Sequence, residues 1–134
     1  LVRPRQGRRD APPERERLDT VLRPGVPIPR YRELRMGLPA KRALLRAWRV
    51  RRPQVVQIVT EGPLGSSALA AAKMLGIPVV SEFHTNFHSY SRHYGLGLFT
   101  QLVAGYLRRL HSKADATLVP TRELAEQLGA AGYR

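Results

Sequence analysis

Residues 55–83 read VVQIVTEGPLGSSALAAAKMLGIPVVSEF and hold a strand, a helix and a second strand in succession. The β-branched run from Val55 to Thr60 predicts a strand buried on both faces of a parallel sheet. An alanine-rich helix is expected from Pro63 to Leu75, where Gly76 ends it. The next apolar run, Val79 to Phe83, is the second strand. This pattern is typical of a βαβ unit.

The same alternation continues on both sides of this unit. Apolar residues at helical spacing predict helices from Pro39 to Arg51 and from Leu96 to His111. A third strand is expected from Ala116 to Val119, and Thr121 caps a further helix that ends at Ala130. Strands and helices in this order predict an α/β fold with right-handed crossovers. We expect a Rossmann-like, doubly wound parallel sheet with helices on both faces.

The first 38 residues are rich in proline and arginine and show less regular patterning. Residues 1–17 are expected to form the end of a strand and then a loop, because prolines and like charges disfavour regular structure. A short strand is expected at Val21 and Leu22, followed by an extended connection to Tyr31. The chain starts at Leu1 without methionine and ends directly after a helix-like segment. We therefore expect one partial domain over 1–134, truncated at both ends, with helix-strand units from residue 39.

The composition gives a net charge of +13, from 23 lysines and arginines against 10 acidic residues. Such a surface favours anionic partners: nucleic acid, phosphorylated lipid or a nucleotide-activated substrate. A GC-rich genome that encodes arginine in place of lysine explains the charge equally well.

Cysteine is absent, which excludes disulfides, thiolate metal sites and a cysteine nucleophile. No apolar run approaches the about 18 residues of a membrane span, and the start resembles no signal peptide, so a cytoplasmic location is expected.

Two loops at predicted strand ends carry the candidate site, because ligands of parallel sheets bind at the carboxyl ends of the strands. The first loop is TEGPLGSS, residues 60–67. Gly62 and Gly65 permit close backbone approach, and a helix start of this kind can bind phosphate or hydroxyl-rich ligands. A purely capping role is an equal alternative. Glu61 can orient a ligand hydroxyl or pair with an arginine.

The second loop, FHTNFHSYSRHY at residues 83–94, holds three of the four histidines and two of the five tyrosines. His84 follows the strand, so its ring can point into a cleft above the sheet. Tyr90 and Tyr94 stand one helical turn apart. Two alternatives remain: a core-packed His84, and a metal site formed with His88 and His93, whose spacings match no familiar site.

Residues 60–65 and 83–87, together with Tyr90 and Tyr94, resemble the N-terminal domain of family 4 glycosyltransferases. The similarity extends over nearly the whole chain and includes bacterial α-mannosyltransferases and sulfoquinovosyltransferase-like enzymes. It implies the N-terminal half of a GT-B fold. It also implies retaining transfer of a sugar from GDP-mannose or a UDP-sugar to a lipid or glycan acceptor, without an essential metal or cofactor.

The resemblance assigns roles to individual residues. It implies that His84 is the catalytic residue, beside the donor sugar and the acceptor. The substrate-binding residues that it implies are Glu61, Gly62, Gly65, Thr85, Asn86, Tyr90 and Tyr94. The family's first strand with its glycine-rich loop and its C-terminal nucleotide-sugar domain are expected outside residues 1–134. We therefore expect this chain alone to be inactive.

Two other functions remain open on the sequence alone. A basic α/β domain that binds nucleic acid fits the charge, although no nucleic-acid-binding motif is present. The hypothesis of a regulatory, receiver-like domain has less support, because no predicted strand ends in the acidic residue that a phosphoacceptor site needs. An arginine-rich helix over residues 41–52 could also touch an anionic membrane, the alternative being a solvated helix face.

Overall fold

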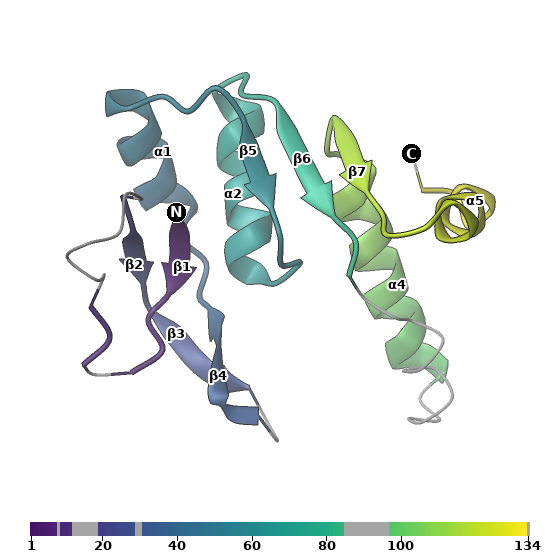
Figure 1. The fold of residues 1–134 in the computed structure, drawn as a ribbon, viewed down its shortest axis with the longest axis horizontal. Coiled ribbons are helices and arrows are strands. Elements are labelled where there is room, and N and C mark those ends of the chain that lie inside the picture. The colour runs from purple at the N-terminus through teal and green to yellow at the C-terminus, as the bar shows by residue number, and fades with distance from the viewer. Residues whose placement is uncertain (8, 12–18, 29–30, 85–96, 134) are drawn as a thin grey trace.

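The computed structural model describes residues 1–7, 9–11, 19–28, 31–84 and 97–133 (Figure 1). A parallel sheet with the strand order β5-β6-β7 lies at its centre. Its strands are β5 (Val56–Ile58), β6 (Val79–Glu82) and β7 (Ala116–Leu118). The helices after β5, before β7 and after β7 are α2 (Pro63–Met74), α4 (Gly97–His111) and α5 (Arg122–Ala130). The predicted order of these elements is confirmed.

The N-terminal part contains two more strand pairs and a helix. Strand β1 (Val2–Pro4) pairs in parallel with β2 (Val21–Arg23). Strand β3 (Gly25–Ile28) pairs antiparallel with β4 (Tyr31–Gly37), and α1 (Lys41–Val50) follows. The prediction of a plain extended connection before Tyr31 was incomplete, because its residues form half of a hairpin. Pro27 is tolerated there since β3 pairs with a single neighbour, and the pairing register shifts directly after it.

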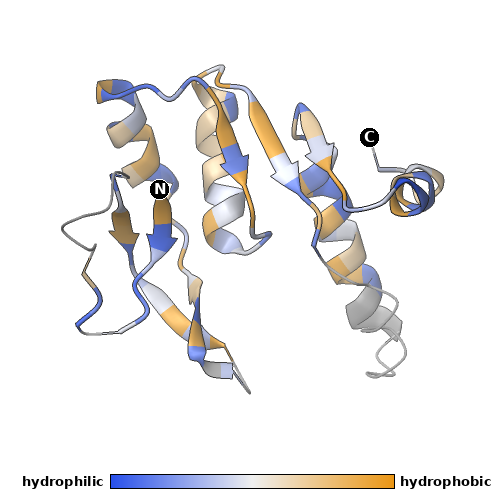
Figure 2. Ribbon diagram, viewed as in Figure 1, coloured by the Kyte–Doolittle hydropathy of each residue, from blue (hydrophilic) through white to orange (hydrophobic). Residues whose placement is uncertain are grey.

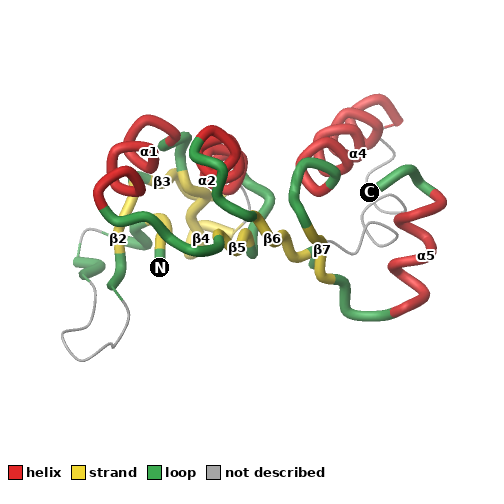
Figure 3. Tube along the Cα trace, turned by 90° about the horizontal axis from the view of Figure 1, so that it is seen from above, coloured by secondary structure: helices red, strands yellow, loops and turns green. Residues whose placement is uncertain are grey.

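Helices α1, α2 and α4 lie on one side of the strands (Figure 3). Strand β5 consequently alternates: Val56 and Ile58 are buried, whereas Gln57 between them is exposed. Its flanking residues Val55 and Val59 are about half exposed, at 51% and 50%. The prediction that this strand is buried on both faces was therefore wrong for the part of the chain that the structure describes. The doubly wound arrangement stays a prediction.

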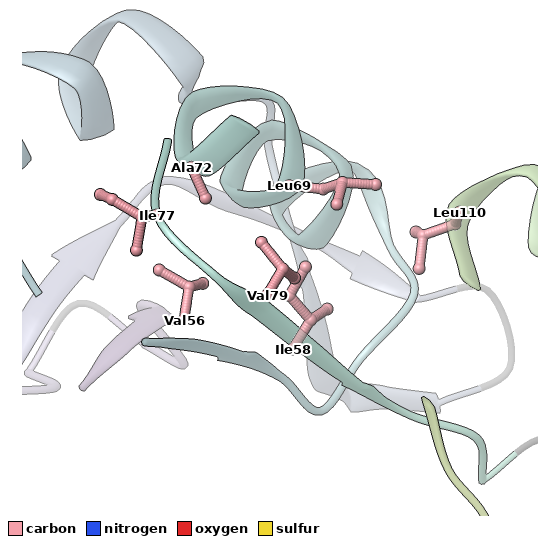
Figure 4. Close-up of a cluster of buried hydrophobic side chains, with 7 residues drawn as sticks. All are labelled: Val56, Ile58, Leu69, Ala72, Ile77, Val79 and Leu110. Carbon is pink, nitrogen blue, oxygen red and sulfur yellow. The ribbon is translucent and has the colours of Figure 1, made fainter. Parts of the chain in front are cut away.

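The core lies between the central sheet and α2. Figure 4 shows its buried side chains, which come from β5, α2, the α2–β6 turn, β6 and α4: Val56, Ile58, Leu69, Ala72, Ile77, Val79 and Leu110. The hydrophobic colouring of α2 and of the start of β6 in Figure 2 follows the same distribution. Burial of these apolar surfaces is the main source of stability for the sheet.

The turn after α2 is confirmed as a glycine-dependent helix end. Gly76 adopts a φ of +62°, a conformation that side chains disfavour. The N–H of Ile77 then donates to the carbonyl of Ala72 at 2.9 Å, which closes the helix and directs the chain into β6.

Asp115 joins the amino ends of β6 and β7 to α2. Its carboxylate accepts hydrogen bonds from Lys73 Nζ at 2.7 Å and from the backbone N–H of Val79 at 2.8 Å. The N–H of Asp115 in turn donates to the Val79 carbonyl at 2.8 Å. The hydrogen bond from Lys73, and then the one from Val79, hold the pKa of this carboxyl below its ordinary value. This network fixes the edge of the sheet opposite the candidate site.

Candidate functional site

The carboxyl ends of β5, β6 and β7 meet at one edge of the sheet (Figure 1). Glu61 follows β5, and His84 follows β6 by two residues. Thr121 follows β7, where its hydroxyl accepts the Leu124 N–H at 3.2 Å and caps α5 as predicted. The chain topology thus brings the loop at residues 60–67, the start of the loop at residues 83–94 and the β7–α5 connection to a single edge.

His84 lies at this edge with its side chain 59% exposed. Its Nε2 is 2.6 Å from Oε2 of Glu82, on the preceding strand. The exposed side chain argues against the alternative of a core-packed histidine bonded to a carbonyl. Because the carboxylate takes the Nε2 position, a ligand would contact this ring through Nδ1.

Glu82 is a site residue that sequence reasoning missed. Its carboxylate also accepts a hydrogen bond from Gln57 Nε2 of the neighbouring strand. The hydrogen bond with His84, and then that from Gln57, lower the pKa of Glu82. Glu82 is therefore an anion that orients the imidazole. The available signal was its position two residues before His84 at the end of a strand, where alternate side chains share a face.

A pocket of about 670 Å³ opens beside His84, between α4 and α5. Its walls combine apolar side chains with a cation and several hydrogen-bonding groups, among them Phe83, His84, Gln101, Arg108, Thr121 and Tyr133. Burial raises the pKa of Tyr133, so its hydroxyl stays protonated at neutral pH. The pocket can hold a mixed polar and apolar ligand next to the His84 ring.

Tyr106 of α4 holds the loop after β5. Its hydroxyl donates to the carbonyl of Glu61 and lies 2.6 Å from Ser66 Oγ. The Glu61 side chain is itself 17% exposed, and its Oε1 is 3.6 Å from Nε2 of the buried His111. Neither Tyr106 nor His111 was expected here. Sequence alone gives no sign that residues of α4 reach this loop.

The start of α2 packs closely on β5 through Gly65. A Cβ added to Gly65 would lie 2.2 Å from the Thr60 carbonyl oxygen, so only glycine fits at this position. At Gly62 an added Cβ would meet Met36 Cγ at 3.6 Å, an ordinary contact. The Ser67 hydroxyl donates to the Pro63 carbonyl at 2.9 Å and is engaged within the fold. Packing against β5 therefore explains why glycine occurs at position 65. A ligand-binding role for Gly62 or Gly65 stays a prediction.

The other candidate residues lie outside the described residues, namely Thr85, Asn86, Tyr90 and Tyr94, together with His88 and His93. Among the described residues, no group of three or more histidine, aspartate or glutamate side chains is arranged to hold a metal ion. Within that same part of the chain, every helix is too short or too polar to cross a membrane.

Comparisons with known proteins support the resemblance seen in the sequence. The model of the family Glycosyltransferase Family 4 matches residues 4–134. A GDP-mannose-dependent alpha-mannosyltransferase of Mycobacterium tuberculosis is 33% identical over 131 residues, which covers 92% of this chain and 34% of that protein. The sulfoquinovosyl transferase of Arabidopsis thaliana is 30% identical over 106 residues, 79% of this chain and 21% of that protein.

A third relative, the alpha-monoglucosyldiacylglycerol synthase of Acholeplasma laidlawii, is 32% identical over 120 residues. That match covers 81% of this chain and 30% of the synthase. The chain spans about a third or less of the length of each of these three relatives. No solved structure matches the chain. Since the family model covers all but the first three residues, the chain belongs to glycosyltransferase family 4.

Proposed function

We propose that residues 1–134 are part of the N-terminal, acceptor-side domain of a retaining glycosyltransferase with a GT-B fold. The enzyme would move a sugar from GDP-mannose or a UDP-sugar to a lipid or glycan acceptor. The relatives' names support this, since they include a GDP-mannose-dependent transferase and a synthase named for a glycolipid. The observation that carries the proposal is the His84–Glu82 pair at the carboxyl edge of the sheet.

His84 is the proposed catalytic residue. Donation of its Nε2–H to Glu82 fixes the ring plane and leaves Nδ1 to accept a hydrogen bond from a sugar hydroxyl. Retaining transfer breaks the bond between the anomeric carbon and the phosphate oxygen, and positive charge develops on the sugar. Hydrogen bonds fixed around that centre stabilise the transition state without reorganisation. The proposed mechanism uses neither a metal nor an organic cofactor.

The remaining candidates are proposed to surround the two substrates. Glu61 would accept a hydrogen bond from a sugar hydroxyl, and the α2 start at Gly62 and Gly65 would approach the donor. Thr85 and Asn86 would extend the contacts of His84. The pocket between α4 and α5 would take part of the acceptor, because it opens directly beside the His84 ring.

A cytoplasmic location with contact to the inner membrane face is part of the proposal. Helix α1 exposes a basic face formed by Lys41, Arg42, Arg46 and Arg49. Each cation near an anionic leaflet contributes about 1 kcal/mol to binding. The alternative of a nucleic-acid-binding domain is supported by charge alone, whereas family membership favours a sugar transferase.

A transfer assay tests the proposal directly. The complete enzyme, incubated with labelled GDP-mannose or UDP-sugars and a panel of lipid and glycan acceptors, should produce labelled glycoside. Residues 1–134 alone should produce no more labelled glycoside than the same fragment with His84→Ala. The reason is that the ribose and diphosphate contacts are expected in the C-terminal domain. If the complete enzyme transfers no sugar but binds DNA with an affinity that collapses at high salt, the nucleic-acid alternative is correct.

A second measurement concerns Tyr90 and Tyr94, which we propose to line the acceptor entrance. Replacing either tyrosine with phenylalanine removes one hydroxyl and should raise the acceptor KM about fivefold, the effect of one lost hydrogen bond. The donor KM should change less, as measured by varying each substrate at saturating levels of the other. A response confined to the donor KM would place these tyrosines on the wrong side of the cleft.

A further inference from the structure

His111 is the last residue of α4, and its side chain is completely buried. Its ring packs against Phe83, with 5.0 Å between ring centroids, and against Tyr133, at 6.1 Å. An apolar side chain could fill this space without the cost of burying two ring nitrogens. The presence of histidine therefore calls for a polar explanation.

The two ring nitrogens of His111 face different groups. Nδ1 lies 2.9 Å from Oγ of the buried Ser81, and that oxygen is 3.0 Å from Thr117 Oγ1. Nε2 is also buried and has no hydrogen-bond partner among the described residues. This nitrogen lies 3.6 Å from Oε1 of Glu61 and therefore faces the carboxylate.

The surroundings of the ring select one tautomer. With the proton on Nε2, the ring presents a donor to the Glu61 carboxylate, and Nδ1 accepts from the Ser81 hydroxyl. Ser81 Oγ in turn accepts from Thr117. The opposite tautomer would place a lone pair against an anionic oxygen, which is repulsive at low dielectric. The Ser81 and Thr117 hydroxyls thus orient the His111 ring so that its Nε2–H points toward Glu61.

We infer that His111 is a positioning residue that orients the Glu61 carboxylate toward a hydroxyl of the sugar substrate. This inference rests on the proposed function. Being fully buried, His111 cannot touch the substrate and acts through Glu61. The 3.6 Å separation is longer than a hydrogen bond, and it closes when a ligand draws Glu61 into place, as catalytic contacts often tighten on binding.

A double-mutant cycle in the complete enzyme tests the inference. His111→Phe keeps a ring of similar size without a donor and should lower kcat/KM about tenfold, within the range of coupled pairs. Glu61→Gln should lower it at least as much. The double variant should be no worse than Glu61→Gln alone, because the histidine acts only through the carboxylate. His111→Gln, whose amide offers a donor, should recover part of the loss. Losses that multiply in the double variant would show a merely structural role.

Nitrogen-15 NMR of the His111 ring in the same intact protein gives a readout that requires no activity. The spectrum should show a proton on Nε2, and Glu61→Gln should shift that resonance, whereas Glu126→Gln on α5 should not. A proton on Nδ1, or no shift, overturns the inference even if sugar transfer is robust. If Glu61→Gln shifts the resonance but the wild-type enzyme transfers no sugar, the contact stands and the proposed function fails.

Discussion

Replacing His84 with alanine should lower the turnover of the complete enzyme about a hundredfold, the effect of losing one group that stabilises charge in the transition state. The melting temperature should change by less than about 2 °C, because the side chain is 59% exposed and takes no part in the core. Steady-state kinetics and thermal unfolding of the two proteins measure both quantities.

Glu82→Gln tests the same pair through its other member. The amide keeps the shape of the side chain but loses the negative charge that holds the imidazole. Turnover should therefore fall in the same direction by a smaller factor, about tenfold. Lys113→Ala, an exposed change after α4, should have no effect on turnover. If His84→Ala lowers the yield of folded protein as much as the activity, the histidine serves the fold.

Gly65→Ala should destabilise the domain by about 3 kcal/mol, the upper range for inserting a methyl group into a packed core. The added Cβ would lie 2.2 Å from the Thr60 carbonyl oxygen and 3.0 Å from Ile58 Cγ2. A backbone oxygen cannot turn away as a flexible side chain does, so α2 must move off β5. Urea unfolding of the complete enzyme, followed by circular dichroism, measures the loss.

Gly105→Ala is the control for the same chemical change in another helix. An added Cβ at Gly105 meets nothing within 4 Å among the described residues. Alanine there should raise stability by up to about 1 kcal/mol, because it favours the helix. Equal stability of wild type and Gly65→Ala would mean that α2 packs on β5 less closely than the structure shows.

The helices and strands from residue 39 onward could be predicted because local chemistry specifies them. Gly76 needs a positive φ, and Thr121 caps α5, so these residues mark helix ends in any tertiary context. The β3–β4 hairpin was missed because its prolines are typical of an extended connection. Whether a proline lies on an edge strand depends on which neighbours pair with it, and the local sequence does not contain that information.

The placement of the candidate residues was predicted only where it follows directly from strand order. His84 and Glu61 come after parallel strands, so the topology places both at the same edge. Tyr106, by contrast, reaches the Glu61 carbonyl from 45 residues away. His111 reaches the Glu61 carboxylate from the same helix. Contacts of this kind depend on how α4 packs against the sheet, and no periodicity in the sequence reveals them.

The position of Asp115 has a consequence for how such an enzyme can diversify. Its bonds to Lys73 and Val79 lie at the amino ends of the strands, away from the loops that we propose to face the substrates. Mutations in those loops can therefore change specificity while the anchoring contacts persist. A directed-evolution library for a new donor or acceptor should randomise residues 60–64 and 120–123 and keep Asp115 and Lys73 fixed.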